Sequence, residues 1–412
     1  MSTSIATQSA LEAAEQKYRP IFERIAAGAL DRELNGTLPF EQIQWLKDAG
    51  FTAARVPVEF GGDGLTWEDF TSLLIELAAA DSNIPQALRS HVAFVEENLY
   101  HHSENDDRSA WFKRFVDGEI AGNAWTEPGK GGVGTVLEER DGKLFLSGTK
   151  FYTTGTIFAE WIDVFAKRPD GSDVSVYIST KTKGVETLDD WDGFGQKGTG
   201  SGTTIFTDAA VDPENVYDFS FRFPYQTAVY QQILLIALAG LTQAAATEAA
   251  KQVKDRKRVF GHGNADLPSQ DPQILQVVGE ISSKAYVAKA ATLKVGQALD
   301  KAFESRIEGG EKEKQANINV ELESGQAQVV LAPLAIDATG QIFTTLGASS
   351  TSTSKALDRY WRNARTVATH NPFIYKARIA GDYAVNGTEP PTVWTIGEAG
   401  IDEKRYGQAA SS

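Results

Sequence analysis

The stretch from residue 123 to residue 216 decides the fold class of this chain. It opens with Asn123-Ala124-Trp125-Thr126-Glu127-Pro128-Gly129, continues through Leu144-Phe145-Leu146-Ser147-Gly148, and closes with Gly202-Thr203-Thr204-Ile205-Phe206. Short runs of β-branched and aromatic residues alternate with Gly, Asp and Pro, which predicts an antiparallel sheet or a small barrel. The flanking sequence is rich in Ala and Leu at helical spacing, so one β-domain between two helical blocks is expected.

We therefore predict an α+β fold, mainly α, in three parts. Residues 1–120 form an N-terminal helical domain, residues 121–217 the middle β-domain, and residues 218–412 a C-terminal helical bundle with an irregular tail. Pro333 lies inside one of the expected bundle helices, where it should cause a kink or a break. The remaining patterns predict helices at about 66–80, 84–118, 221–257, 271–307 and 313–346.

Composition narrows the classes of partner. The net charge of -15 argues against nucleic acid and anionic membranes, which both select clustered Lys and Arg. The absence of cysteine excludes disulfides, thiolate nucleophiles and Cys-ligated zinc. The most apolar run, Ala228 to Ala246, is interrupted by glutamines and indicates a buried helix, and no secretory signal is recognised. A cytoplasmic location is the default expectation.

Histidines and glycines offer the first candidate sites. His91 lies among apolar residues, so it is either a core histidine satisfied by hydrogen bonds or an active-site acid or base. The adjacent His101 and His102 lack a second ligand pair at helical spacing, and no metal site is expected. The glycine-rich segment 61–64 precedes a helix but lacks the Lys-Ser/Thr pair of a nucleotide-binding loop, which favours a simple turn.

A basic cluster stands out in this acidic chain. It runs from Lys251 to Arg258, includes Arg256, and is followed by Phe260. The cluster is either a solvated helix face or an anion site for a phosphate.

Four stretches resemble the acyl-CoA dehydrogenase superfamily. They are residues 51–65 with their aromatic-Gly-Gly-x-Gly-Leu ending, the Thr-Glu-Pro sequence at 126–128, residues 148–161 with Gly-x-Lys and a terminal Trp, and residues 206–215 with Phe-x-Asp and Pro-Glu-Asn. Their order and spacing along nearly the whole chain are similar to that family. The resemblance implies a helical domain, a middle β-domain and a C-terminal four-helix bundle, in a homotetramer that binds flavin between the β-domain and the bundle.

Departures from the family pattern point to a different reaction. Asn371 stands where many acyl-CoA dehydrogenases have a catalytic glutamate, and a neutral amide cannot abstract a proton. His370 precedes it in place of the usual aromatic residue. The segment Gly347-Ala348-Ser349-Ser350 replaces a glycine-rich turn against the adenine half of FAD, which favours FMN over FAD.

The chain is similar to the flavin-dependent monooxygenases of this fold, of the dibenzothiophene monooxygenase type. This resemblance implies a two-component system in which a separate NAD(P)H-dependent flavin reductase supplies reduced FMN. Oxygen then adds at flavin C4a, and the hydroperoxide transfers one oxygen atom to a small apolar substrate. The accepting atom is typically sulfur and in some relatives nitrogen.

The resemblance also assigns roles to residues. His370, His91 and Asn123 are the catalytic candidates, as donors to the reacting oxygen and the flavin. The other expected flavin contacts fall into four groups. Thr153 and Thr154 are expected at the N5 edge, and Trp125 and Trp191 at the pocket walls. The phosphate is expected to meet Arg256 or Arg258 from a neighbouring subunit, with Phe260, Ser349 and Ser350, and the loop positions are Thr126 and Asn371.

Three classes of function remain open. The first is the oxygenase, acting on a sulfide, sulfoxide or sulfone, or on an amine as an N-hydroxylase. The second is an FAD-dependent acyl-CoA dehydrogenase or oxidase that uses another base. The third is a non-catalytic flavin- or acyl-CoA-binding scaffold.

Overall fold

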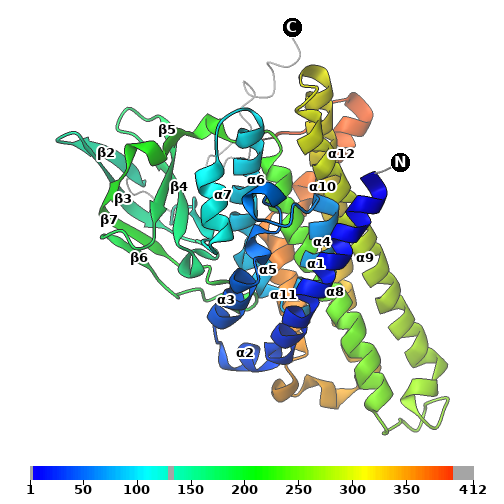
Figure 1. The fold of residues 1–412 in the computed structure, drawn as a ribbon. Coiled ribbons are helices and arrows are strands. Elements are labelled where there is room, and N and C mark those ends of the chain that lie inside the picture. The colour runs from blue at the N-terminus through cyan, green and yellow to red at the C-terminus, as the bar shows by residue number, and fades with distance from the viewer. Residues whose placement is uncertain (1–2, 129–133, 393–412) are drawn as a thin grey trace.

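The β-rich stretch forms one eight-stranded sheet at the side of an otherwise helical molecule (Figure 1). The computed structural model describes residues 3–128 and 134–392, so the last part of the predicted tail lies outside the described residues. The order of the paired strands is β6-β7-β3-β2-β4-β5-β8, with β1 paired to β4. Their bounds are β1 Ala121–Ala124, β2 Val136–Arg140, β3 Lys143–Lys150, β4 Trp161–Lys167, β5 Asp173–Ser179, β6 Val185–Thr187, β7 Thr204–Val211 and β8 Val216–Asp218.

The sheet is mixed, which corrects the prediction of a purely antiparallel one. Most neighbours are antiparallel, but β1 runs parallel to β4, with Ala121 beside Trp161 and Ala124 beside Val164. Alternation along β1 buries Ala124 in the sheet core and leaves Asn123 and Trp125 on the opposite face. That face is turned away from the sheet core, and both of its side chains are only partly buried.

Seven α-helices precede the sheet among the described residues. They are α1 Thr3–Ala27, α2 Ala29–Asn35, α3 Phe40–Asp48, α4 Trp67–Ala80, α5 Asn83–Ala87, α6 Arg89–Ser103 and α7 Ser109–Val116. The expected helix at 66–80 is confirmed, with the Thr66 hydroxyl accepting from the Asp69 backbone N–H as its N-cap. The expected helical run at 84–118 is divided into three. The glycine-rich segment 61–64 is a turn, with Gly61 and Gly64 at φ values of 96° and 62°.

In the part of the chain that the structure describes, five α-helices follow the sheet: α8 Gln226–Asp255, α9 Pro272–Ser305, α10 Gly310–Leu346, α11 Asp358–His370 and α12 Phe373–Asn386. The first four pack together as the predicted bundle, and α12 lies against α10 (Figure 1). The prediction of a break at Pro333 is wrong, because α10 continues through this residue.

Both α8 and α10 are long and apolar enough to cross a membrane by composition alone. However, α8 is the central helix of the bundle: Gln232 Nε2 donates to Thr71 Oγ1 at 3.0 Å and to the Thr292 carbonyl at 2.9 Å. These buried hydrogen bonds tie α8 to α4 and α9 and agree with the predicted buried helix.

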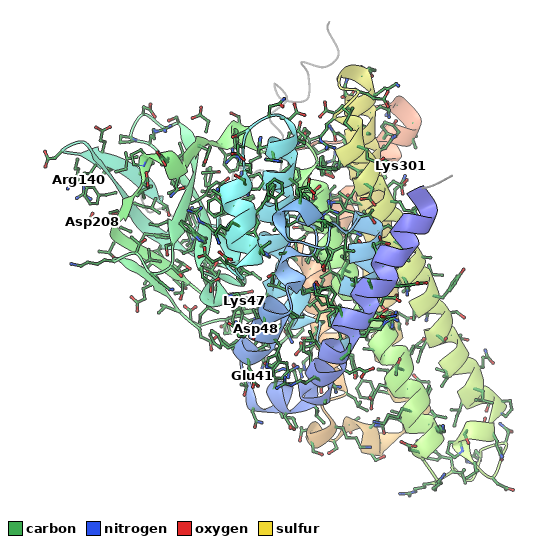
Figure 2. All side chains as sticks on the ribbon, viewed as in Figure 1. Glu41, Lys47, Asp48, Arg140, Asp208 and Lys301 are labelled. Atoms are coloured by element: carbon green, nitrogen blue, oxygen red, sulfur yellow. The ribbon has the colours of Figure 1, made fainter. Side chains whose placement is uncertain are left out.

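Ion pairs join the three parts of the chain. Lys47, on the side of α3 that faces the sheet, contacts Glu160 at 2.7 Å (Figure 2). Arg222, just before α8, contacts Asp163 of β4 at 3.0 Å and Glu97 of α6 at 3.6 Å. These side chains, apart from the partly exposed Glu160, are largely buried, so the sheet, α6 and the start of α8 meet at a fixed junction.

Candidate functional site

His370 is the last residue of α11, at the edge of this junction. Helix α11 buries one face, which includes Tyr360, Ala364 and Val367, in the bundle. Pro372 follows shortly and cannot continue the helix. The His370 ring is therefore presented beyond a firmly packed helix, and its Nε2 atom lies 3.0 Å from Nη1 of Arg89, the first residue of α6.

The contacts of His370 define its tautomer. Arginine can only donate hydrogen bonds, so Nε2 of His370 accepts from Arg89. The proton is then on Nδ1, which donates to Asn371 Oδ1 at 3.2 Å. The ring is open to solvent on one side, yet the surrounding protein and the positive charge of Arg89 lower the pKa of His370 to about 3. His370 is thus a neutral imidazole with both nitrogens occupied.

Asn371 is held by the bundle and cannot act as a base. Its Nδ2 donates to Gln231 Oε1 of α8 at 3.0 Å, and its carbonyl accepts from Gln328 Nε2 of α10 at 2.6 Å. The position expected to carry a carboxylate in a dehydrogenase therefore carries an amide fixed by two glutamines.

Arg89 was not predicted as a site residue from the sequence. Its Nε donates to the Tyr230 carbonyl at 3.0 Å, and its guanidinium lies 4.8 Å from the centre of the Tyr230 ring. Within residues 3–128 and 134–392 no carboxylate pairs with it, and burial lowers its pKa to about 10. The sequence contained a signal for an unpaired Arg89. The residues three and four positions from it are Pro85, Gln86, Val92 and Ala93, and none of these can neutralise a cation.

Trp125 borders the same region. Its ring lies 5.3 Å from that of Tyr230, and its Nε1 donates to Asp163 Oδ2 at 3.0 Å. Arg222 covers the ring at 4.2 Å and pairs with both Asp163 and Glu97. The carboxylates near Trp125 are therefore engaged by a cation, and the role of Trp125 as a pocket wall stays a prediction.

Asn123 and Thr126 are the polar residues beside Trp125. Asn123 shares its face of β1, and its backbone carbonyl accepts from Thr156 Oγ1 at 2.9 Å. Its side-chain amide has no hydrogen-bond partner among the described residues. Thr126 pairs through its backbone with Phe151. The amide of Asn123 is thus available to a ligand.

Thr153 and Thr154 are buried, and their hydroxyls are already used. Thr153 Oγ1 donates to the Gly202 carbonyl at 2.9 Å, and Thr154 Oγ1 lies 2.7 Å from Ser201 Oγ. These bonds connect the segment after β3 to the segment before β7. The place predicted for both threonines beside the flavin N5 stays a prediction.

Trp191 lies in the loop between β6 and β7. Its Nε1 donates to the Gly195 carbonyl at 3.2 Å, and Gly195 packs against Arg362 and Thr366 of α11. Thr366 and His370 are four residues apart and share one face of α11. Trp191 is therefore connected to the helix face that ends at His370.

His91 makes no contact with His370 and faces the core instead. Its Nε2–H donates to the Thr52 carbonyl at 2.8 Å, and its Nδ1 accepts from the Ala121 N–H at 3.3 Å. Burial, and to a lesser degree Lys47, lower its pKa to about 4. His91 and Arg89 are two residues apart on α6 and point to opposite sides. The alternative of a satisfied core histidine is what the structure shows, and the predicted catalytic role is corrected accordingly.

The candidate phosphate residues gather at the far end of α10. Arg256 Nη1 donates to the Leu346 carbonyl, and both Arg256 and Phe260 contact Gly347. Ser350 is buried and donates to the Gly347 carbonyl at 2.6 Å, while Ser349 and Arg258 are exposed. Leu346 follows Gln328 by eighteen residues, or roughly 27 Å of helix. One chain cannot bring this group to its own His370, so its role at the flavin phosphate stays a prediction that needs a second subunit.

The residues near His370 fit the isoalloxazine of FMN. A flavin ring needs flat apolar walls and donors along its pyrimidine edge. Trp125 and Tyr230 provide aromatic surface, and the side-chain amide of Asn123 provides N–H groups that have no acceptor in the described chain. Among the described residues, no group of potential metal ligands is found.

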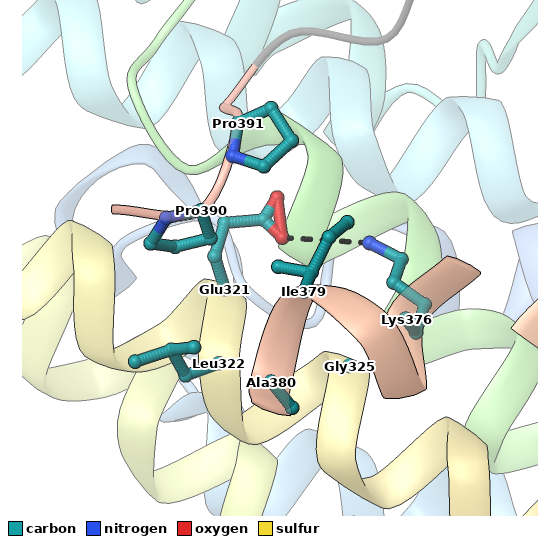
Figure 3. A pocket seen from close by; sticks show the side chains of 8 residues that line it. All are labelled: Glu321, Leu322, Gly325, Lys376, Ile379, Ala380, Pro390 and Pro391. Atoms are coloured by element: carbon teal, nitrogen blue, oxygen red, sulfur yellow. Dashed lines mark ion pairs between the residues drawn. The ribbon is translucent and has the colours of Figure 1, made fainter. Parts of the chain in front are cut away.

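Two hollows beside α10 contain none of the predicted site residues. The smaller, of about 10 Å³, lies between α10 and α12, where Lys376 and Glu321 form a buried ion pair at 3.9 Å (Figure 3). It has room for one water molecule, so this pair fastens α12 and holds no flavin. The larger, an open groove of about 610 Å³, runs along α10 past Pro333 and Arg365.

Comparison with known proteins agrees with this architecture. The family model for the N-terminal domain of acyl-CoA dehydrogenase matches residues 7–119, and the model for its C-terminal domain matches residues 234–374. A dibenzothiophene monooxygenase of Mycolicibacterium goodii is 25% identical over 381 residues, which cover 88% of this chain and 91% of that protein. The probable FMNH2-dependent monooxygenase SfnC of Pseudomonas putida is also 25% identical over 381 residues, covering 90% and 94%.

A solved structure has the same fold. The complex of TdsC from Paenibacillus sp. A11-2 with FMN and indole superposes with a TM-score of 0.81 at 23% identity, covering 92% of this chain and 99% of that one. The resemblance inferred from the four sequence motifs is thereby confirmed, and the predicted fold with it. The chain belongs to the acyl-CoA dehydrogenase superfamily.

Proposed function

We propose that this protein is an FMN-dependent monooxygenase that uses reduced FMN and O2 to oxygenate an organosulfur compound. A separate NAD(P)H-dependent flavin reductase supplies the reduced FMN, and the oxygen is transferred from a C4a-hydroperoxyflavin. The active form is a cytoplasmic homotetramer in which Arg256 or Arg258 of one subunit approaches the flavin phosphate of another.

The observation that carries the proposal is the lack of a free carboxylate near His370. An α,β-dehydrogenation needs a base to remove a proton from carbon. Here Asn371 is an amide bound to Gln231, and His370 is neutral against Arg89. Asp163 and Glu97, the acids near Trp125, are both paired with Arg222. The described residues are therefore poorly equipped for desaturation, whereas oxygen transfer needs hydrogen-bond donors and exclusion of water.

The relatives support the same reaction class. Those compared above are named as monooxygenases, one acting on dibenzothiophene and one dependent on FMNH2, and TdsC binds FMN. We assign to Asn123 a hydrogen bond to the reacting oxygen or a flavin carbonyl. His370, released from Arg89 when substrate binds, handles the proton of the leaving flavin oxygen.

The test is turnover with isotopically labelled O2, FMN, NADH and a generic flavin reductase, over a panel of organosulfur compounds. A monooxygenase places one labelled atom in the product and the other in water, whereas a dehydrogenase or oxidase leaves the organic product unlabelled. Replacing FMN with FAD should lower turnover. Unlabelled product, or tightly bound FAD in the purified protein, would remove the proposal.

The residue assignment has its own control. His370→Ala should abolish product formation without changing the thermal unfolding temperature appreciably. Arg378→Gln on α12 removes an exposed charge with no hydrogen bond or ion pair in the described chain, and it should match the wild type. Full turnover by His370→Ala would show that this histidine has no part in the reaction.

A further inference from the structure

Arg89 is a cation with no anionic partner in the described chain. It lies at the start of α6, partly buried, between Tyr230 of α8 and His370 of α11. Burying a charge is costly unless it is paired, so buried arginines ordinarily meet carboxylates. Its neighbour Arg222 follows that rule, with both Asp163 and Glu97 as partners. In the described chain, Arg89 has only a carbonyl and a neutral imidazole.

The guanidinium also keeps donors unused. Of its five N–H groups, one on Nε binds the Tyr230 carbonyl and one on Nη1 binds His370. Nη2 has no protein acceptor among the described residues, and it is not among the atoms sealed from solvent. The free side of Arg89 is thus accessible, and it adjoins the ring edge of His370, the catalytic candidate.

We propose that Arg89 is the receptor for a negatively charged oxygen group on the substrate, so that the organosulfur compound is an oxyanion such as an alkane- or arenesulfinate. This inference rests on the proposed function. Two N–H groups of a guanidinium match the two oxygens of a sulfinate, as they match a carboxylate. A neutral sulfide would leave the Arg89 charge uncompensated in a closed site.

The chemistry balances with the reactants of the proposed function. The lone pair of the sulfinate sulfur forms a new S–O bond to one atom of O2, which gives a sulfonate. The O–O bond breaks, and the second oxygen leaves as water with two protons and the two electrons supplied by reduced FMN. An anion on Arg89 also lowers the positive potential at His370, which raises the pKa of that imidazole and prepares it to carry a proton.

The experiment compares substrates of nearly equal shape and different charge. Methanesulfinate and dimethyl sulfoxide have the same number of heavy atoms, as do benzenesulfinate and methyl phenyl sulfoxide. Binding of each to the FMN-loaded protein is measured by calorimetry, and KM and kcat are measured with a flavin reductase. The variants are Arg89→Gln, Arg89→Lys and the control Arg378→Gln.

We expect the wild type to bind each sulfinate at least about 10-fold more tightly than its neutral partner. Arg89→Gln should weaken sulfinate binding and raise its KM by about 10- to 100-fold, with little change for the sulfoxides or for FMN. Arg89→Lys should retain part of the preference and remain informative if Arg89→Gln folds poorly. Arg378→Gln should behave as the wild type.

Other outcomes overturn the inference. Equal binding of charged and neutral partners by the wild type would exclude an anion receptor. A loss of FMN affinity in Arg89→Gln, with an unchanged preference for sulfinate, would assign Arg89 to the flavin. Because calorimetry needs no turnover, sulfinate binding without oxygenation would refute the proposed function and leave the receptor standing.

Discussion

Replacing Arg222 with methionine should destabilise the protein in a pH-dependent way. Arg222 is largely buried, pairs with Asp163 and Glu97, and covers Trp125. Burial alone would lower its pKa, but Asp163 and Glu97 offset this and raise it, so the charge is permanent. Methionine keeps much of the volume and removes the charge, which leaves two acids in the junction between the sheet and α6.

The size of the effect follows from the loss of a buried partner. Breaking such a pair costs about 3–5 kcal/mol, because the remaining charge is uncompensated. With an unfolding entropy of about 2.1 cal/mol/K per residue, the 412-residue chain should lose about 3–6 °C in its unfolding temperature. The network also positions Trp125, so weaker FMN binding should accompany the loss.

The pH dependence has a definite sign. Burial raises the pKa of Glu97 above its ordinary value even though Arg222 opposes this. In Arg222→Met the folded-state pKa rises further. Above that pKa the buried carboxylate is charged and its cost is fully present. As the pH falls through the folded pKa the native state takes up a proton first, so stability is regained until both states are protonated.

Thermal unfolding at about pH 8 and about pH 5.5 tests this reasoning. Arg222→Met should be closer to the wild type at the lower pH. The double variant Arg222→Met with Glu97→Gln should recover stability at the higher pH, although Glu97→Gln alone lowers it. An equal loss at both pH values, or no recovery in the double variant, would contradict a buried charge network.

Three further predictions concern the site and its support. His91→Gln should cost about 1–3 kcal/mol of stability, measured by thermal unfolding, while turnover per folded molecule stays unchanged. Because the pKa of His370 is about 3, its titration should leave no inflection in kcat/KM between about pH 5 and pH 8; Arg89→Gln should raise that pKa, as NMR of the labelled imidazole would report. Gly155→Ala should destabilise by more than about 1 kcal/mol, because Gly155 has a φ of 78° and an added methyl would collide with the Ala87 carbonyl.

The fold was largely predictable because its signals are periodic and local. Helix α4 begins at a threonine cap, and the turn between α9 and α10 falls at Gly309, where the sequence changes from apolar spacing to Gly and Glu. The parallel pairing of β1 with β4 was not predictable, since their register depends on a connection of almost forty residues. Pro333 does not break α10, because the packing of α10 against its neighbouring helices outweighs the local cost of one proline.

The site was only half predictable, and α6 explains why. The residues around His91 left a core histidine and an acid or base both open, and only the family resemblance assigned it a catalytic role. Its position is decided by Thr52 and Ala121, which are 39 and 30 residues away and bind both ring nitrogens. Once His91 faces that core, helical geometry turns Arg89 toward α8 and α11. His91 and Arg89 lie on opposite sides of α6, so only one of them can face His370, and that residue is Arg89. With His91 and other side chains of α6 buried on the opposite side, the accessible guanidinium of Arg89 lies beside His370, where it can select a substrate by charge.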